Sequence, residues 1–188
     1  MQKATLRKEY RQKRQDLADR HLIKHLSLDI LTTFLEHIEV KDKNVFIFLP
    51  IRKFLEVETL EWIPPFQVEG ANIFISKSNP KTLEMDIYQF SEDLILKENQ
   101  WGIPEPVQGN KVEPDLIDIV VTPLLISDQK GFRVGYGKGF YDRFFKICPN
   151  SLKVGVNFFD PIYQIQDIDQ NDISLDALVL PEKFHAYK

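Results

Sequence analysis

The segment from Lys130 to Phe145, "KGFRVGYGKGFYDRFF", contains the residue types that phosphate chemistry requires. Four of the chain's eight glycines lie in it, at positions 131, 135, 137 and 139. Glycines allow positive φ and a close approach of the backbone to a ligand, so that exposed N–H groups can hold phosphate oxygens. Arg133 and Lys138 add full positive charges. Asp142 follows Lys138 by one helical turn, and its carboxylate is a candidate ligand for Mg²⁺ bound to the same phosphates.

Two standard phosphate-binding motifs do not fit this segment. A Walker A loop needs Ser or Thr after Lys138, where Gly139 stands, and it needs a glycine in place of Phe132. A dinucleotide fingerprint that starts at Gly135 needs its third glycine in place of Phe140. From the residue types alone, a phosphate-binding loop and a tight turn that only caps the next helix both stay open.

Hydrophobic periodicity indicates the elements that position this segment. It predicts two N-terminal helices, over about 3–17 and 21–38. Continuous apolar runs predict buried strands at "NVFIFLP", "ANIFIS", "LIDIVVTP", "LKVGVNFF" and "LDALVLP", whereas "MDIYQF" alternates like a half-exposed strand. We also predict a short helix at "VETLEWIPP" that Pro64 and Pro65 end, a loop at "QWGIPEPVQGN", and a helix from the glycine segment to about Cys148.

Strands that are continuously apolar and alternate with helices favour one α/β domain over residues 1–188. We expect three layers, α/β/α, with a mostly parallel sheet and N-terminal helices. In such sheets ligands bind beyond the carboxyl ends of the strands, where a loop passes into a helix. The glycine segment is expected in that position.

Composition and charge argue against several classes of protein. The net charge is −4 and the basic residues concentrate in the first 25 positions, so we expect no nucleic-acid partner. No apolar run approaches the roughly 20 residues of a membrane-spanning helix, and no signal-peptide core follows Met1. We therefore expect a cytoplasmic protein without a membrane partner. The single cysteine, Cys148, excludes an intramolecular disulfide.

The segment "RVGYGKGFYDR" resembles the R-L-G-R-G-[GK]-G-Y-Y-D-R signature of the 5-formyltetrahydrofolate cyclo-ligase (5,10-methenyltetrahydrofolate synthetase) family. Segments similar to other parts of that family are "KATLRKEYRQKR", "FLPIRKFLEVET", "WGIPEP", "DIVVTPLLISDQKGFRVGYGKGFYD" and "NDISLDALV". They occur in the family's order and spread over nearly the whole chain. The resemblance implies ATP- and Mg²⁺-dependent cyclisation of 5-formyltetrahydrofolate to 5,10-methenyltetrahydrofolate, with release of ADP and phosphate. Transfer of the γ-phosphoryl group to the formyl oxygen would create an iminium phosphate intermediate.

The resemblance also implies roles for individual residues. The ATP site would comprise Lys3, Arg7, Arg133, Gly135, Tyr136, Gly137, Lys138, Gly139, Phe140 and Tyr141. Of these, Lys138 and Arg133 would be catalytic, because they stabilise charge on the transferred phosphoryl group. The folate site would comprise Leu49, Glu56, Trp101, Tyr136, Gly137, Phe140 and Tyr141. Glu56 would accept hydrogen bonds from the pterin amino group and ring N–H. Asp142 and Asp176 would hold Mg²⁺.

Two departures from the family pattern bear on ligand binding. Tyr136 stands where many members carry a second arginine, so that a stacked aromatic ring and weakened ATP binding are both open there. In the loop over 158–171, the segment after Pro161 lacks the proline that many members place shortly before the closing Asp, and the pair Asn171 and Asp172 replaces the commoner His-Asp.

Two other classes of function stay open. One is a non-catalytic folate- or nucleotide-binding module, and the other is a sugar-phosphate isomerase or CoA transferase on a similar sheet. We expect small-molecule substrates, and the sequence does not separate a monomer from a homodimer.

Overall fold

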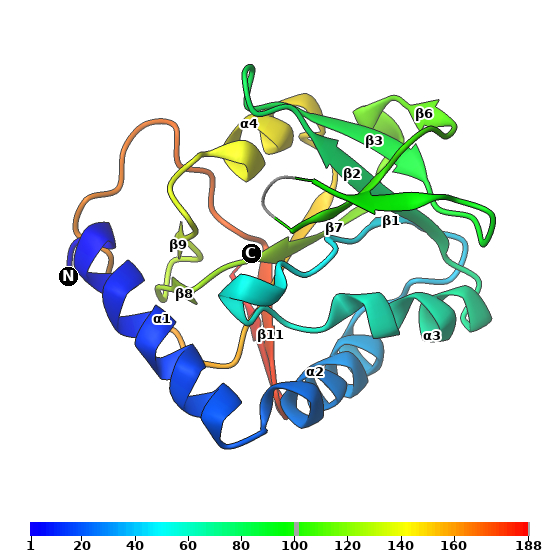
Figure 1. Ribbon diagram of the computed structural model, residues 1–188. Coiled ribbons are helices and arrows are strands. Elements are labelled where there is room, and N and C mark those ends of the chain that lie inside the picture. The colour runs from blue at the N-terminus through cyan, green and yellow to red at the C-terminus, as the bar shows by residue number, and fades with distance from the viewer. Residues whose placement is uncertain (100–101, 188) are drawn as a thin grey trace.

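A computed structural model describes residues 1–99 and 102–187 (Figure 1). Within these residues, eight strands form one sheet in the order β12-β11-β10-β7-β1-β2-β3-β6. The central five strands are parallel: β11 (Ala177–Leu180), β10 (Leu152–Val156), β7 (Ile119–Pro123), β1 (Asn44–Phe46) and β2 (Asn72–Ser78). The outer three are antiparallel to their neighbours: β12 (Lys183–Ala186), β3 (Met85–Gln89) and β6 (Lys111–Val112). The prediction of a mostly parallel sheet is confirmed.

Helices cover both faces of the sheet (Figure 1). On one face, α2 (Ile23–His37) and α3 (Ile63–Val68) bury Phe34 and Phe66 against the strands. On the other face, α4 (Phe140–Ile147) buries Phe144 and Phe145. The predicted three-layer α/β/α arrangement is therefore confirmed. No helix of the described residues is long and apolar enough to cross a membrane.

The parallel strands are buried on both sides, as their continuous apolar sequences predict. In β7 the residues Ile119, Val120 and Val121 are all buried, and in β10 Val154 pairs with Val121. The strand β1 ends at Phe46, earlier than "NVFIFLP" indicates, although residues 47–50 remain buried.

Two local predictions were wrong. Pro64 and Pro65 do not end a helix: a short 3₁₀ turn, η2 (Thr59–Trp62), leads into α3, and the prolines occupy its first turn. A proline is favourable there because the first N–H groups of a helix have no intrahelical partner. The second error concerns "QWGIPEPVQGN", where Pro104–Pro106 forms β5 and pairs antiparallel with β4 (Leu96–Glu98).

Because β1, β7 and β10 are parallel neighbours, the segments that follow them meet at one edge of the sheet. After β1 comes the 3₁₀ turn η1 (Arg52–Phe54). After β7 comes the two-stranded ribbon of β8 (Ile126–Ser127) and β9 (Arg133–Val134), which leads into the glycine segment. The helix α1 (Lys3–Asp19) lies beside this ribbon (Figure 1). The fold thus places α1, η1 and the glycine segment around the carboxyl edge.

Candidate active site

The glycine loop, residues 135–139, contacts the side chain of Arg7 on α1. Gly137 has φ +90° and Gly139 has φ +67°, a region that favours glycine, and Gly139 caps the start of α4. Arg7 donates from Nε to the carbonyl of Gly135 at 2.9 Å. A side-chain carbon at position 137 would lie only 3.3 Å from the Arg7 guanidinium. The structure therefore brings together Arg7 and the glycines, both predicted for the ATP site.

Lys3 lies one turn before Arg7 and forms an ion pair with Asp172. Its backbone N–H also donates to the Asp167 carboxylate at 2.7 Å, which ties the start of α1 to the loop after β10. Asp172 belongs to the "NDISLD" segment, in which only Asp176 was expected to bind a ligand. Its ion pair with Lys3, a residue predicted to bind phosphate, identifies Asp172 as a further residue of the candidate site.

Arg133 is buried and points toward a carboxylate rather than into solvent. It forms an ion pair with Asp142 at 2.8 Å, donates to the carbonyl of Ile173 at 2.5 Å, and lies 4.7 Å from the centre of the Phe145 ring. Burial lowers the pKa of its guanidinium, and the neighbouring Asp142 carboxylate opposes that effect. In this structure Arg133 orients Asp142, so its predicted contact with phosphate stays a prediction.

Lys138 is exposed at the tip of the glycine loop. Its carbonyl accepts a hydrogen bond from Arg143, whose Nε also donates to the carbonyl of Leu83 at 3.0 Å. Arg143, which the sequence analysis did not single out, thereby holds the backbone of Lys138 while the lysine side chain faces outward.

The two carboxylates predicted to hold Mg²⁺ lie in different surroundings. Asp142 is in the first turn of α4, and its Oδ1 accepts hydrogen bonds from Arg133 and from the backbone of Ile173. Asp176 precedes β11 at the amino ends of the strands, where its Oδ2 accepts a 2.8 Å hydrogen bond from the backbone of Lys153. Asp176 lines a surface hollow there with Asp118.

Asp172, in contrast, adjoins the surroundings of Asp142. It directly precedes Ile173, the residue whose backbone contacts both Arg133 and Asp142. The charge of Asp172 opposes the lowering of the Arg133 pKa that burial causes. Among the described residues, no group of three or more His, Cys, Asp or Glu side chains is arranged to hold a metal ion. A cation at this place would therefore need further ligands from phosphate oxygens or water.

Glu56 supplies a buried carboxylate beside the glycine loop. It is 2% exposed, and its Oε2 accepts a 2.6 Å hydrogen bond from the backbone of Ile51. Its Oε1 is buried and has no hydrogen-bond partner among the described residues. Burial raises the pKa of Glu56, while the Ile51 N–H and the Arg14 charge oppose the rise. A buried acceptor without a partner is the kind of group that a ligand N–H satisfies.

Tyr136 connects the glycine loop to η1. Its ring stacks on Phe54 with the ring centres 4.3 Å apart, and its hydroxyl accepts a 2.9 Å hydrogen bond from Arg14. Burial raises the pKa of Tyr136, and the nearby Glu56 carboxylate raises it further. Of the two readings left open at this position, the structure shows a stacked ring, with a protein side chain as its partner.

The remaining predicted folate residues pack against the core. Leu49 is buried among the residues that α2 and α3 cover. Phe140 and Tyr141 are partly buried on the opposite face, where the Tyr141 ring centre lies 6.3 Å from that of Phe46. Burial raises the pKa of Tyr141, and the Glu56 charge adds to this. Trp101 lies outside the described residues.

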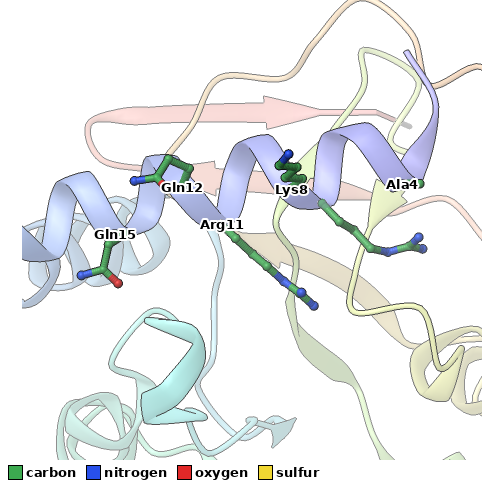
Figure 2. A pocket seen from close by; sticks show the side chains of 6 residues that line it. Ala4, Lys8, Arg11, Gln12 and Gln15 are labelled. Carbon is green, nitrogen blue, oxygen red and sulfur yellow. The ribbon is translucent and has the colours of Figure 1, made fainter.

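The exposed side of α1 presents polar and basic side chains near the glycine loop and the Phe54–Tyr136 pair. Figure 2 shows these side chains, with Arg11 extending away from the helix. The residues on this side are Ala4, Arg7, Lys8, Arg11, Gln12 and Gln15. The Arg11 guanidinium lies 5.5 Å from the Phe54 ring centre and 5.8 Å from that of Tyr136. Cations of α1 thus flank both the glycine loop and the aromatic pair.

Comparisons with known proteins agree with these features. The family model described as the 5-formyltetrahydrofolate cyclo-ligase family matches residues 1–181. A probable 5-formyltetrahydrofolate cyclo-ligase from Schizosaccharomyces pombe is 35% identical over 184 residues, which cover 89% of each chain. The 5-formyltetrahydrofolate cyclo-ligase of Mus musculus is 29% identical over 149 residues, which cover 73% of this chain and 72% of the relative.

A solved structure is also similar to this chain. The 5,10-methenyltetrahydrofolate synthetase of Aquifex aeolicus superposes with a TM-score of 0.83 at 29% identity, and the match covers 100% of this chain and 94% of that one. The resemblance drawn from the sequence motifs is thereby confirmed. The chain belongs to the 5-formyltetrahydrofolate cyclo-ligase family.

Proposed function

We propose that this protein converts 5-formyltetrahydrofolate to 5,10-methenyltetrahydrofolate at the expense of ATP, with release of ADP and phosphate. One observation carries the proposal. Arg7 contacts the glycine loop, and Tyr136 of that loop interacts with the buried carboxylate of Glu56, which has one oxygen without a partner among the described residues. The first group suits phosphate oxygens and the second suits the N–H groups of a pterin. The names of the relatives support the folate ligand.

The reaction requires a better leaving group than a formamide oxygen. Transfer of the γ-phosphoryl group to the formyl oxygen gives an iminium phosphate, N10 of the folate attacks the activated carbon, and the carbon–oxygen bond breaks to release phosphate. The protein needs no nucleophile, because positioning and charge neutralisation carry such a transfer. Lys138 and Arg7 are suited to neutralise the phosphoryl oxygens, and Glu56 is suited to fix the pterin.

We assign the Mg²⁺ that the reaction requires to Asp142 and Asp172 rather than to Asp176. Both contacts of Asp142 with described residues use Oδ1, which leaves Oδ2 for a cation. Asp172 is on the adjoining segment, next to Lys3. Bound there with phosphate oxygens, Mg²⁺ would neutralise charge on the phosphates. The residues present therefore fit one ion shared with ATP.

We propose that the protein acts as a monomer or as a homodimer, the two states that the sequence leaves open. We further propose that residues 1–188 act as one domain, since α1 at one end of the chain and the segment before β11 at the other end both contribute to the site.

Isotope transfer tests the proposed chemistry. If the formyl oxygen is phosphorylated, ¹⁸O placed in the formyl group of the substrate appears in the released inorganic phosphate. Mass spectrometry of that phosphate, after a single turnover with ATP and Mg²⁺, measures the transfer. Unlabelled phosphate together with methenyl product would contradict the phosphorylated intermediate, and ADP formation without added folate would contradict the coupling of the two substrates.

A further inference from the structure

Arg14 is a buried cation to which neither the motifs nor the proposed mechanism assigns a part. It lies on α1 and is 1% exposed, which is rare for an arginine unless its donors are paired. One nitrogen, Nη1, donates to the carbonyl of Phe54 at 3.2 Å and to the hydroxyl of Tyr136 at 2.9 Å. The other, Nη2, donates to the carbonyl of Leu124 at 2.5 Å. A single guanidinium thus joins η1, the end of β7 and the glycine loop to α1.

One of these partners, Tyr136, lies near Glu56, the carboxylate that is predicted to bind folate. The ring of Tyr136 stacks on Phe54, and the carbonyl of Phe54 is held by the same guanidinium. Tyr136 and Arg14 both lower the pKa of Glu56, against the larger rise that burial causes.

Arg14 also acts on Glu56 through its charge. Within the described residues Arg14 has no carboxylate at ion-pair distance, so its charge is balanced by carbonyls, by a hydroxyl and by the field of Glu56. Other charged or titratable groups also act on Glu56: Glu58 on its own segment, Tyr136 on the glycine loop and Tyr141 on α4. Among these groups and Arg14, Arg14 alone is a cation.

We propose that Arg14 is a positioning residue for the folate: from within α1 it fixes the Tyr136–Phe54 pair next to Glu56, the buried acceptor proposed for the pterin N–H groups. The inference rests on the proposed function, because it concerns how Glu56 meets that substrate. A purely structural Arg14 would tie α1 to the sheet without any influence on the ionisation of Glu56. The two roles differ in what they do to the pH dependence of folate binding.

The test measures the dissociation constant of 5-formyltetrahydrofolate by calorimetry, without ATP, over a range of pH. For Arg14→Gln we expect binding weaker by about tenfold or more, as for the loss of a charged hydrogen-bond partner. Folate affinity falls at low pH as Glu56 is protonated, and we call this part of the pH profile the acid limb. In Arg14→Gln the acid limb should move to higher pH, because the neutral amide no longer opposes protonation of Glu56. Arg14→Lys keeps the charge, so its acid limb should stay near that of the wild type although its affinity falls.

Two further variants keep the test decisive if Arg14→Gln does not fold. Tyr136→Phe retains the ring stack and removes only the hydroxyl, and it should move the acid limb in the same direction by a smaller amount. In a Glu56→Gln background, Tyr136→Phe should leave the pH dependence unchanged. Arg20→Gln, a change at an exposed arginine at the end of α1, serves as the matched control and should bind folate like the wild type.

The outcomes separate the two hypotheses. An unmoved acid limb in Tyr136→Phe, and in Arg14→Gln where it folds, would overturn the positioning role while the wild type still turns over. Equal losses of folate and ATP binding at every pH would have the same meaning, since they indicate general damage. Absence of folate binding by the wild-type protein would instead refute the proposed function, and the inference with it.

Discussion

At the scale of single residues, the site contains charged side chains that are buried, although burial of a charge costs free energy. Glu56 is the clearest case, because its carboxylate is buried and one of its oxygens has no partner in the part of the chain that the structure describes. Burial raises its pKa above the ordinary value of 4.5. Its ionised form therefore costs free energy until a ligand supplies hydrogen bonds.

Glu56→Gln should stabilise the ligand-free protein near neutral pH. A carboxyl with a raised folded pKa binds protons more tightly in the folded state, so wild-type stability falls as pH rises from the unfolded pKa through the folded one. The glutamine removes this cost and retains an oxygen for the Ile51 N–H. We expect a higher free energy of unfolding at pH 7 than in the wild type, measured by denaturant unfolding, together with weaker folate binding.

Exposed Glu69→Gln provides the control, and its stability should follow that of the wild type across pH. A Glu56→Gln protein that is less stable at neutral pH, or one that binds folate with unchanged affinity, would contradict the role given to this carboxylate.

Lys138→Ala should lower kcat by about 100-fold or more, the size typical for loss of one group that stabilises transition-state charge. The side chain is exposed on the glycine loop, so the melting temperature should not change. Steady-state kinetics with thermal unfolding checks both expectations, with exposed Lys130→Ala as the control. Full activity in Lys138→Ala would remove this lysine from the mechanism.

At the scale of elements, α1 and the glycine loop are fitted to each other. Gly137 needs its positive φ and leaves room for the Arg7 guanidinium, whose carbon would lie 3.3 Å from an added Cβ. The loop geometry and the position of Arg7 are thus set by the same residue.

Gly137→Ala should cost about 1–2 kcal/mol from the left-handed backbone alone, which lowers the melting temperature by roughly 3–6 °C in a chain of this size. ATP binding should weaken as well, because the methyl group displaces Arg7. Gly135→Ala is the matched control for stability, since a Cβ there meets nothing within 4 Å and no positive φ is required. Equal melting temperatures for the two variants would show that the fit at Gly137 is unimportant.

The main elements could be predicted from sequence where pattern and burial agree. Continuous apolar runs identify β7, β10 and β11, because strands covered on both faces need no polar alternation. Pro64 and Pro65 misled the prediction, since a proline ends one helix and begins another equally well, and only the chain beyond it decides.

At the scale of the whole molecule, the parallel order of β1, β7 and β10 gathers the site at one edge, and this level was the hardest to foresee in detail. Asp172 and Asp176 belong to one short segment, yet the first contacts Lys3 and the second contacts Lys153 at the amino ends of the strands. Arg14 is one of several Lys and Arg residues of α1, so its residue type alone does not mark it as buried. Contacts between segments far apart in the sequence determine both the different surroundings of the two aspartates and the burial of Arg14.

Two aspartate variants test the different roles proposed for Asp172 and Asp176. Asp172→Asn should raise the Mg²⁺ concentration needed for half-maximal activity by about tenfold or more, the size seen when a metal site loses a carboxylate that supports it. Asp176→Asn should lower the melting temperature, because it removes the charge beside Lys153, and should leave the Mg²⁺ requirement unchanged. The reverse result would restore Asp176 as the metal ligand.

Membership of the cyclo-ligase family favours the ligase over a sugar-phosphate isomerase or a CoA transferase on a similar sheet. The most direct test of the whole account is the near-ultraviolet absorbance of purified protein mixed with 5-formyltetrahydrofolate, ATP and Mg²⁺. The account predicts a rise from the methenyl product that stops when either ATP or Mg²⁺ is omitted. Binding of folate and ATP without any rise would contradict it, and would leave a module that binds both ligands but does not join their chemistry.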